Sequence, residues 1–166
     1  INASDITKEA LWNAVETARD ETSLSAKGTN NDPIIFIGKL GADIKASKVQ
    51  KLKITLKVPE DTEAQLLFTT KEDTKWSESK GKKFVSTSDD YAEYIIDTGA
   101  LAGWSGNLNQ IRIDPVNKKD VEFSFKSLEF LSRPGEPSKT ITIDGKAFDV
   151  DFAPTVNEAG DIFLAF

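Results

Sequence analysis

Apolar and polar residues alternate along much of the chain, which predicts a protein built from β-strands. The clearest case is the segment 107–114, where Ile111 and Ile113 fall on one face. The polar residues of the opposite face are Gln110, Arg112 and Asp114. Pro115 has no N–H to donate to a neighbouring strand, so the strand is expected to end there.

The segment 121–131 repeats the alternation, with a change of phase part of the way along. Its apolar positions are Val121, Phe123, Phe125, Leu128 and Phe130. Because the period slips by one position, we expect a β-bulge near Lys126 and Ser127. We also expect 107–114 and 121–131 to be two strands of one sheet.

Five further segments have the length and residue types of short strands. They are 34–37, 51–58, 64–70, 82–85 and 91–97. Turn-forming residues lie between them, as in Pro59–Thr62 and Thr98–Gly103. Several short strands separated by turns are typical of an all-β sandwich or jelly roll.

The C-terminal part of the chain has a different character. Ser132–Ser138 contains two prolines and a glycine, which is typical of a linker or a sharp crossing. The segment 139–152 predicts a β-hairpin around the favoured turn Asp144-Gly145 and resembles repeats of bacterial cell-surface stalk domains. Residues 161–166 form a candidate final strand. We expect a sandwich in 1–134, and in 135–166 a tail that packs on it or begins a neighbouring domain.

The turn Trp104-Ser-Gly106 ahead of strand 107–114 also resembles a known family. In galactose-binding-like β-jelly-roll carbohydrate-binding modules of secreted bacterial polysaccharide-degrading enzymes, this run reads roughly W-x-G-x-I-x-x-L-R-I-D-P. Further similar segments follow in the expected order: Asn31–Ile35, Ile44–Lys48, Leu52–Leu56, Ala64–Thr70, Trp76–Lys80 and Tyr94–Asp97. The resemblance spans about residues 12–131 and implies a β-sandwich jelly roll that binds polysaccharide.

Two readings of segment 5–19 stay open. Apolar residues recur at helical spacing after candidate caps at Ser4 or Thr7: Leu11, Ala14, Val15 and Ala18. The family resemblance instead implies extended chain around Trp12.

Composition narrows the possible partners and chemistry. The 166 residues are 39% hydrophobic and 29% charged, enough for one folded domain with a full core. A net charge of −6 argues against nucleic acid and anionic membranes, because both require basic surfaces. The chain has no Cys and no His, which removes disulfides, thiol nucleophiles and the usual general base. Because the first residue is Ile1, we expect a processed or excised segment.

Sugar binding requires aromatic faces for the C–H faces of sugar rings and planar polar groups for hydroxyls. Outward residues of the strands form a candidate lane: Lys53, Thr55, Gln65, Leu67, Thr69, Gln110, Arg112, Asp114, Ser124 and Lys126. Gln110 and Arg112 are the strongest candidates, with Gln65 and Asp114 beside them. The alternative is a solvated sheet face on which Arg112 pairs with a carboxylate.

The aromatic residues divide between sugar contacts and packing. Trp76 lies among charged residues and is either a sugar platform or a packing residue, and Tyr91 is a candidate rim contact. We expect Trp104 to be a structural wedge in its turn and Tyr94 to belong to the core. Trp12 gives no clear signal.

The resemblance also implies a structural calcium held by oxygen ligands from the first loops and the last strand. The position of the acidic ligand on that strand falls near Lys126, whose charge opposes a cation. We therefore expect no calcium at the usual place and no cofactor. Whether Glu16, Asp20 and Asp32 supply oxygens elsewhere is left open.

Two carboxylates can suffice for a glycosidase, and candidates are Glu93, Asp97, Asp114 and Glu122. With 27 acidic residues, such pairs arise by chance, and no nucleotide-binding or nucleophile motif is present. We expect a non-enzymatic, monomeric, extracellular or cell-surface module that anchors a parent glycoside hydrolase to plant polysaccharide, with xylan favoured. The alternative is a cell-surface adhesion or spacer domain without a sugar site.

Overall fold

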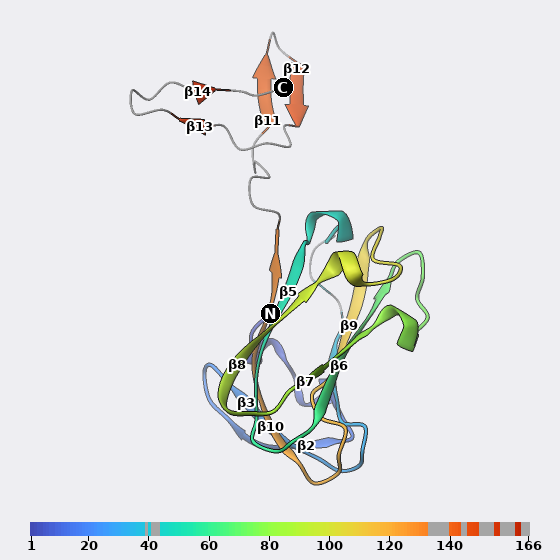
Figure 1. Ribbon diagram of the computed structural model, residues 1–166, viewed down its shortest axis with the longest axis vertical. Helices are drawn as coiled ribbons and strands as arrows, with labels where there is room; N and C mark the ends of the chain where they lie inside the picture. Colours follow the sequence, from blue (N-terminus) through green and yellow to red (C-terminus); the bar gives the residue numbers. More distant parts are fainter. Residues whose placement is uncertain are drawn as a thin grey trace. The chain divides into compact units, whose positions relative to one another are not determined.

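The computed structural model describes residues 1–38, 40, 44–132, 140–143, 146–149, 155–156 and 162–163, with side chains described up to residue 132. The chain divides into two compact units, Ile1–Leu131 and Ser132–Phe166. The first unit holds two five-stranded antiparallel sheets, which confirms the expected all-β sandwich (Figure 1). The predicted role of 135–166, as a packed tail or the start of another domain, stays a prediction.

Each sheet is named here after one of its outer residues. The Arg112 sheet contains, in spatial order, β1 (Leu11–Trp12), β4 (Ile34–Ile37), β9 (Leu108–Asp114), β6 (Glu63–Thr70) and β7 (Lys82–Val85). The Tyr91 sheet contains β2 (Ala14–Arg19), β3 (Leu24–Gly28), β10 (Glu122–Leu131), β5 (Lys51–Val58) and β8 (Ser88–Asp97). Short 3-10 turns lie at Ala3–Asp5, Lys8–Ala10, Ala46–Lys48, Glu78–Lys80 and Thr98–Ala100.

The seven strands expected from the alternation are all present, but one pairing was wrong. β9 and β10 lie in different sheets, although the sequence predicts that they share one. Alternation identifies the buried face of a strand and not its neighbour. The residues after Pro115 are enough to cross the ~10 Å between facing sheets, so the chain changes sheets there.

The inner faces of the two sheets form one continuous apolar core. Phe68, Ile111 and Ile113 come from the Arg112 sheet, and Phe123 and Phe125 from the Tyr91 sheet; all five are fully buried. The register of β10 against β5 shifts between Phe125 and Ser127, which confirms the predicted bulge. The bulge lets Leu128 join the core after the change of phase.

The N-terminal segment is extended rather than α-helical, as the family resemblance implied. Two 3-10 turns precede β1, and β2 follows and pairs with β3. No residue of β2 is buried and Val15 is exposed, so burial imposes no alternation on its sequence. This is why β2 has no clear strand pattern.

In the second unit, β11 (Thr140–Ile143) pairs with β12 (Lys146–Asp149), and Ile143 is opposite Lys146. This register confirms the predicted hairpin, while the turn 144–145 itself lies outside the described residues. β13 (Thr155–Val156) pairs with β14 (Ile162–Phe163), so part of the expected final strand is present. The predicted linker at 133–138 lies outside the described residues.

The turn between β2 and β3 makes a testable contribution to acid stability. The Asp20 carboxylate accepts hydrogen bonds from the backbone N–H groups and hydroxyls of Thr22 and Ser23, which lowers its pKa from 3.8 to about 2. A lowered carboxyl pKa adds stability that is present above the unfolded value and lost as the pH falls through the folded value. We therefore expect Asp20→Ala to destabilise the protein at pH 6 and to have little effect near pH 2. Urea unfolding at both pH values measures this, and an equal loss at both would contradict it.

Candidate functional site

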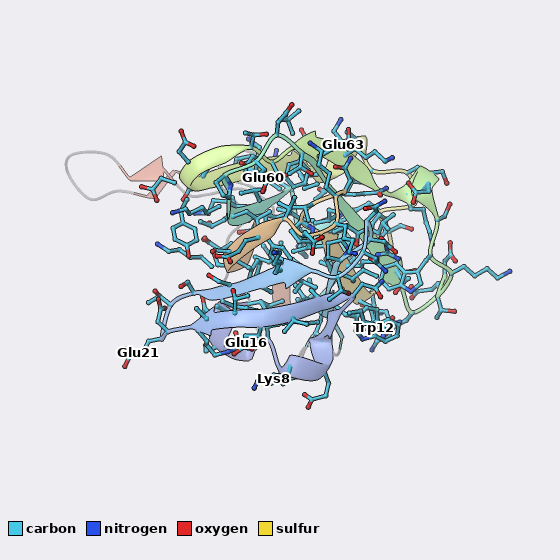
Figure 2. The ribbon with its side chains drawn as sticks, turned by 90° about the horizontal axis from the view of Figure 1, so that it is seen from below. Lys8, Trp12, Glu16, Glu21, Glu60 and Glu63 are labelled. Carbon is cyan, nitrogen blue, oxygen red and sulfur yellow. The ribbon has the colours of Figure 1, made fainter. Side chains whose placement is uncertain are left out.

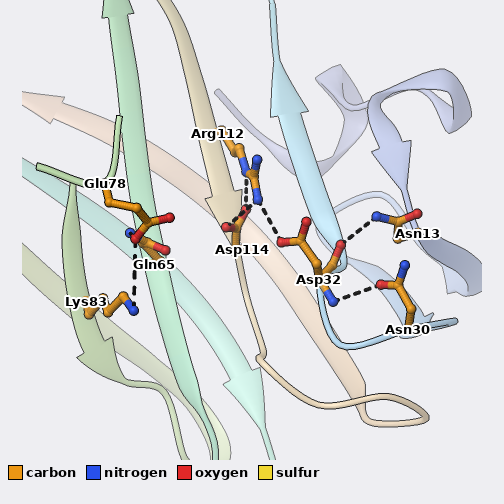
Figure 3. Close-up of polar contacts among 8 residues, drawn as sticks. All are labelled: Asn13, Asn30, Asp32, Gln65, Glu78, Lys83, Arg112 and Asp114. Carbon is orange, nitrogen blue, oxygen red and sulfur yellow. Dashed lines mark hydrogen bonds and ion pairs between the residues drawn. The ribbon is translucent and has the colours of Figure 1, made fainter. Parts of the chain in front are cut away.

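Arg112 is the centre of a polar row on the outer face of the Arg112 sheet. Its Nε and Nη2 donate to the two carboxylate oxygens of Asp114 at 2.6 and 2.8 Å, which forms a bidentate pair. Nη2 also donates, at 2.7 Å, to Oδ1 of Asp32, which lies in the loop before β4 (Figure 3). The Arg112 side chain is 22% exposed and that of Asp32 57%, so Asp32 presents an open carboxylate to solvent.

Burial and the contact with Arg112 act on the pKa of Asp114 in opposite directions. Burial raises the pKa of the Asp114 carboxyl, while its hydrogen bond to Arg112 opposes the rise. The charges of Asp32 and Glu78 raise the pKa of Asp114 further. The same hydrogen bond raises the pKa of the Arg112 guanidinium. Arg112 therefore stays charged and holds Asp114 and Asp32 in fixed positions.

The row continues to both sides of Arg112, as Figure 3 shows. On the β6 side, Gln65 Nε2 donates to Glu78 Oε2 at 2.7 Å, and Lys83 lies 3.9 Å from Glu78. On the β4 side, Asn13 donates to the Asp32 carbonyl at 2.8 Å. A hollow of about 180 Å³ lies along the row, and its lining includes Asp32, Gln65, Lys83 and Asp114.

An aromatic strip borders the polar row and consists of Trp12, Phe36 and Trp76. The rings of Trp12 and Phe36 are stacked, with centroids 5.8 Å apart and an interplanar angle of 17°. Trp76 meets Phe36 edge to face at 5.7 Å. Phe36 is the cross-strand partner of Arg112, so strip and row are adjacent on one sheet. Trp12 is 57% exposed and lies at the surface beside the N-terminal strands (Figure 2).

The loop 71–81 carries Trp76 across the outer face of the sheet. Its hydrogen bonds include Thr70 N–H to the Asp73 carbonyl at 3.0 Å and Lys80 Nζ to Asp73 Oδ2 at 3.0 Å. Gly81 closes the loop against β6, because a Cβ there would meet the Leu66 carbonyl at 2.7 Å. The loop places Trp76 against Phe36 although β9 lies between β6 and β4.

A cleft of about 780 Å³ begins at the other side of Phe36. Its described lining comes from the N-terminal segment and the end of β4: Ile1, Asp5, Ile6, Thr7, Glu9, Ala10, Phe36, Ile37, Gly38 and Leu40. The lining is mostly apolar, with the carboxylates of Asp5 and Glu9 among it. The aromatic strip therefore continues from the sheet face into a groove.

The structure brings together five of the six residues predicted for the site. Arg112, Gln110 and Asp114 lie on β9, Gln65 lies on β6, and Trp76 reaches the same sheet through its loop. Tyr91 lies on β8 of the other sheet, with Lys126 Nζ 4.1 Å from its ring centre. The single lane of outward residues is thus divided between two sheets, since Lys53, Thr55, Ser124 and Lys126 belong to the Tyr91 sheet. Leu67 and Thr69 are buried.

Sequence reasoning missed Trp12, Phe36 and Asp32 as parts of one surface. Phe36 sits in the apolar run Ile34–Ile37, in which an outward aromatic residue cannot be told from a core residue. The available signal was its position between Ile35 and Ile37, which places it on the opposite face of the strand from them. The expected wedge role of Trp104 is confirmed, because its Nε1 donates to the Ala46 carbonyl and its ring meets Phe68. Gly106 of this turn has a φ of +68°.

The three carboxylates considered for a metal lie in separate hydrogen-bond networks. Glu16 pairs with Arg19 at 2.9 Å, Asp20 accepts from its own turn, and Asp32 pairs with Arg112. Within the part of the chain that the structure describes, no three Asp or Glu side chains gather as a metal site would require. Within the same part, no helix has the length and apolar character needed to cross a membrane.

Comparison with solved structures identifies proteins with the same architecture. Mutants of the family 29 carbohydrate-binding module CBM29-2, complexed with cellulohexaose or mannohexaose, are each 13% identical with a TM-score of 0.52. Each match covers 71% of this chain and 75% of that chain. The low-affinity xylan-binding module CBM86 from Roseburia intestinalis is 14% identical with a TM-score of 0.56, over 80% of this chain and 93% of that one. No protein-family model and no curated protein matches the chain. The likeness confirms the expected β-sandwich fold of carbohydrate-binding modules.

Proposed function

We propose that this protein is a non-catalytic carbohydrate-binding module whose sugar site is the outer face of the Arg112 sheet. The observation that carries the proposal is the aromatic strip beside a preorganised polar row. Apolar C–H faces of a pyranose ring cover aromatic rings, while ring hydroxyls donate to carboxylates and amides. The structural neighbours named above, which bind cello- and manno-oligosaccharides or xylan, support this assignment.

The site fits an extended, β-linked chain better than a single sugar. Trp12, Phe36 and Trp76 follow one another along the face, and the cleft beyond Phe36 lengthens the surface. Polar groups lie beside the strip at two separate places. One is the open Asp32 carboxylate before β4, and the other is the Gln65–Glu78 pair next to β6. Xylan is our first candidate, and cello- and manno-configured chains are the others.

We infer that the work of the module is tethering. A bound module raises the local concentration of polysaccharide around a parent enzyme without adding a chemical step. A shallow, solvent-exposed surface gains little net free energy, so a Kd of roughly 10 μM to 1 mM is expected. A secreted or cell-surface location and a monomeric state accompany this proposal.

Two of the four carboxylates considered for catalysis, Asp114 and Glu93, have other partners. Asp114 is bound bidentately by Arg112, and Glu93 pairs with Lys53 at 3.2 Å on the other sheet. A glycosidase requires two carboxyl groups that face one glycosidic bond, with one of them able to give up a proton. These two groups lie in different sheets.

Native affinity electrophoresis with a panel of soluble glycans tests the proposal. We expect retardation on at least one of xylan, β-glucan and glucomannan, unchanged by EDTA, and no release of reducing ends on long incubation. Retardation on none of them would favour the spacer domain. Loss of binding in EDTA would reveal a metal requirement, and reducing ends abolished by one carboxylate substitution would indicate a glycosidase.

A further inference from the structure

The charges around the proposed site are mostly negative. Within the part of the chain that the structure describes, the polar row contains four carboxylates, Asp32, Glu63, Glu78 and Asp114, and their ion pairs involve two cations, Lys83 and Arg112. The cleft at the far side of Phe36 adds Asp5 and Glu9. Its described lining includes no Lys or Arg, and its cationic group is the N-terminal ammonium of Ile1, which donates to the Leu128 carbonyl at 3.0 Å. The whole chain also carries a net charge of −6.

The two cations of the row are already engaged. Arg112 is bound by two carboxylates at 2.6–2.8 Å. Lys83 lies 3.9 Å from both Glu63 and Glu78. A carboxylate on a ligand would therefore compete with internal carboxylates for these cations, while the open oxygens of Asp32 and Glu78 repel it.

The Asp114 carboxyl responds to the charges of its neighbours. Burial is the largest cause of its raised pKa and Arg112 opposes the rise, but the charges of Asp32 and Glu78 raise the pKa further, so each of them disfavours another negative charge close by. A neutral sugar does not meet this penalty, because its hydroxyls donate hydrogen bonds to the same carboxylate oxygens.

We propose that Asp32 and Glu78 make the site selective for uncharged polysaccharides and against polyuronates and other acidic glycans. The inference rests on the proposed function and deepens it by naming the ligand class. Specificity of this kind comes from a repulsive element built against the wrong ligand rather than from extra contacts to the right one.

Two matched pairs of glycans test the proposal by affinity electrophoresis or titration. Arabinoxylan and glucuronoxylan share a xylan backbone, and hydroxyethyl cellulose and carboxymethyl cellulose share a glucan backbone. In the pair whose backbone is recognised, we expect the neutral member to bind about tenfold more tightly at low salt. Raising the salt from about 0.02 M to 0.5 M should strengthen binding of the acidic member and leave the neutral one unchanged, because the Debye length falls severalfold.

The double variant Asp32→Asn with Glu78→Gln isolates the cause. Both replacements keep an oxygen that accepts from Arg112, Gln65 or a sugar hydroxyl. We expect the affinity for the acidic glycan, measured relative to that for its neutral partner, to rise about tenfold. The double variant Glu93→Gln with Glu129→Gln, an equal charge change on the Tyr91 sheet, should leave this ratio unchanged.

The outcomes separate the two proposals. Equal binding of neutral and acidic members at every salt concentration would overturn the selectivity and leave the module standing. Tighter binding of the acidic member would also overturn it. Binding to none of the four glycans, nor to the β-glucan and glucomannan of the first panel, would overturn the carbohydrate-binding function together with this inference.

Discussion

Trp76→Ala should abolish detectable glycan binding while the protein stays folded. Trp76 supports the strip by its edge contact with Phe36 and is only partly buried, so its removal takes away sugar-covering surface without opening the core. Covering an aromatic side chain contributes ~1.5–3 kcal/mol, which is about tenfold or more in Kd. For a site with a starting Kd near 0.1 mM, that loss removes retardation on the gel. Trp12→Ala should weaken binding by a similar factor.

The matched control is Tyr91→Ala, which removes an aromatic side chain from the outer face of the other sheet. It should leave affinity unchanged. The tryptophan emission of the wild type should also shift on titration with the bound glycan, because Trp12 is 57% exposed. A Tyr91→Ala variant that loses binding, beside a Trp76→Ala variant that keeps it, would move the site to the Tyr91 sheet.

Arg112→Ala should weaken glycan affinity by about tenfold or more and should also lower stability. Arg112 holds Asp32 and Asp114 in place, so its loss leaves the buried Asp114 without its bidentate partner. An unpaired buried carboxylate costs about 1–3 kcal/mol. Thermal melting and isothermal titration of the same sample measure the two effects.

The control for this prediction is Lys53→Ala on the Tyr91 sheet. Lys53 Nζ is likewise held between two carboxylates, Glu93 at 3.2 Å and Glu129 at 3.0 Å, and should not affect sugar binding. The double variant Arg112→Ala with Asp114→Asn should recover stability but not affinity. If it regains full affinity as well, Arg112 is a structural residue only, and the polar row does not bind sugar through it.

Three residues of the site show which of its features the sequence predicts and which it does not. Arg112 was correctly placed on an outward face, because its neighbours Ile111 and Ile113 fix the orientation of β9. The carboxylate pairing of Arg112 that the alternative interpretation expected is present, since Asp114 and Asp32 bind it, and whether this face binds sugar stays a prediction. Asp114 was visible because it shares that face, whereas Asp32 is distant in sequence and gave no pairing signal.

The aromatic strip could not be assembled from the sequence, because its three rings come from three separate segments. Trp12 lies on β1, Phe36 on β4 and Trp76 in the loop after β6. Only the spatial order of the strands, with β9 between β4 and β6, brings these segments to one face. The same strand order explains why Tyr91 and Lys126 do not belong to the expected lane, because their strands lie in the opposite sheet.

Local patterning by itself therefore determined seven of the strands, most of their buried faces, the bulge after Phe125 and the end of β9 at Pro115. These features follow from short-range physics: the two-residue period of a strand, the missing N–H of proline and the burial of apolar side chains. Which strands share a sheet, and hence which outward residues share a surface, was decided only by the tertiary structure. Alternation carries no information about the partner of a strand, because pairing and sheet-to-sheet packing join residues far apart along the chain.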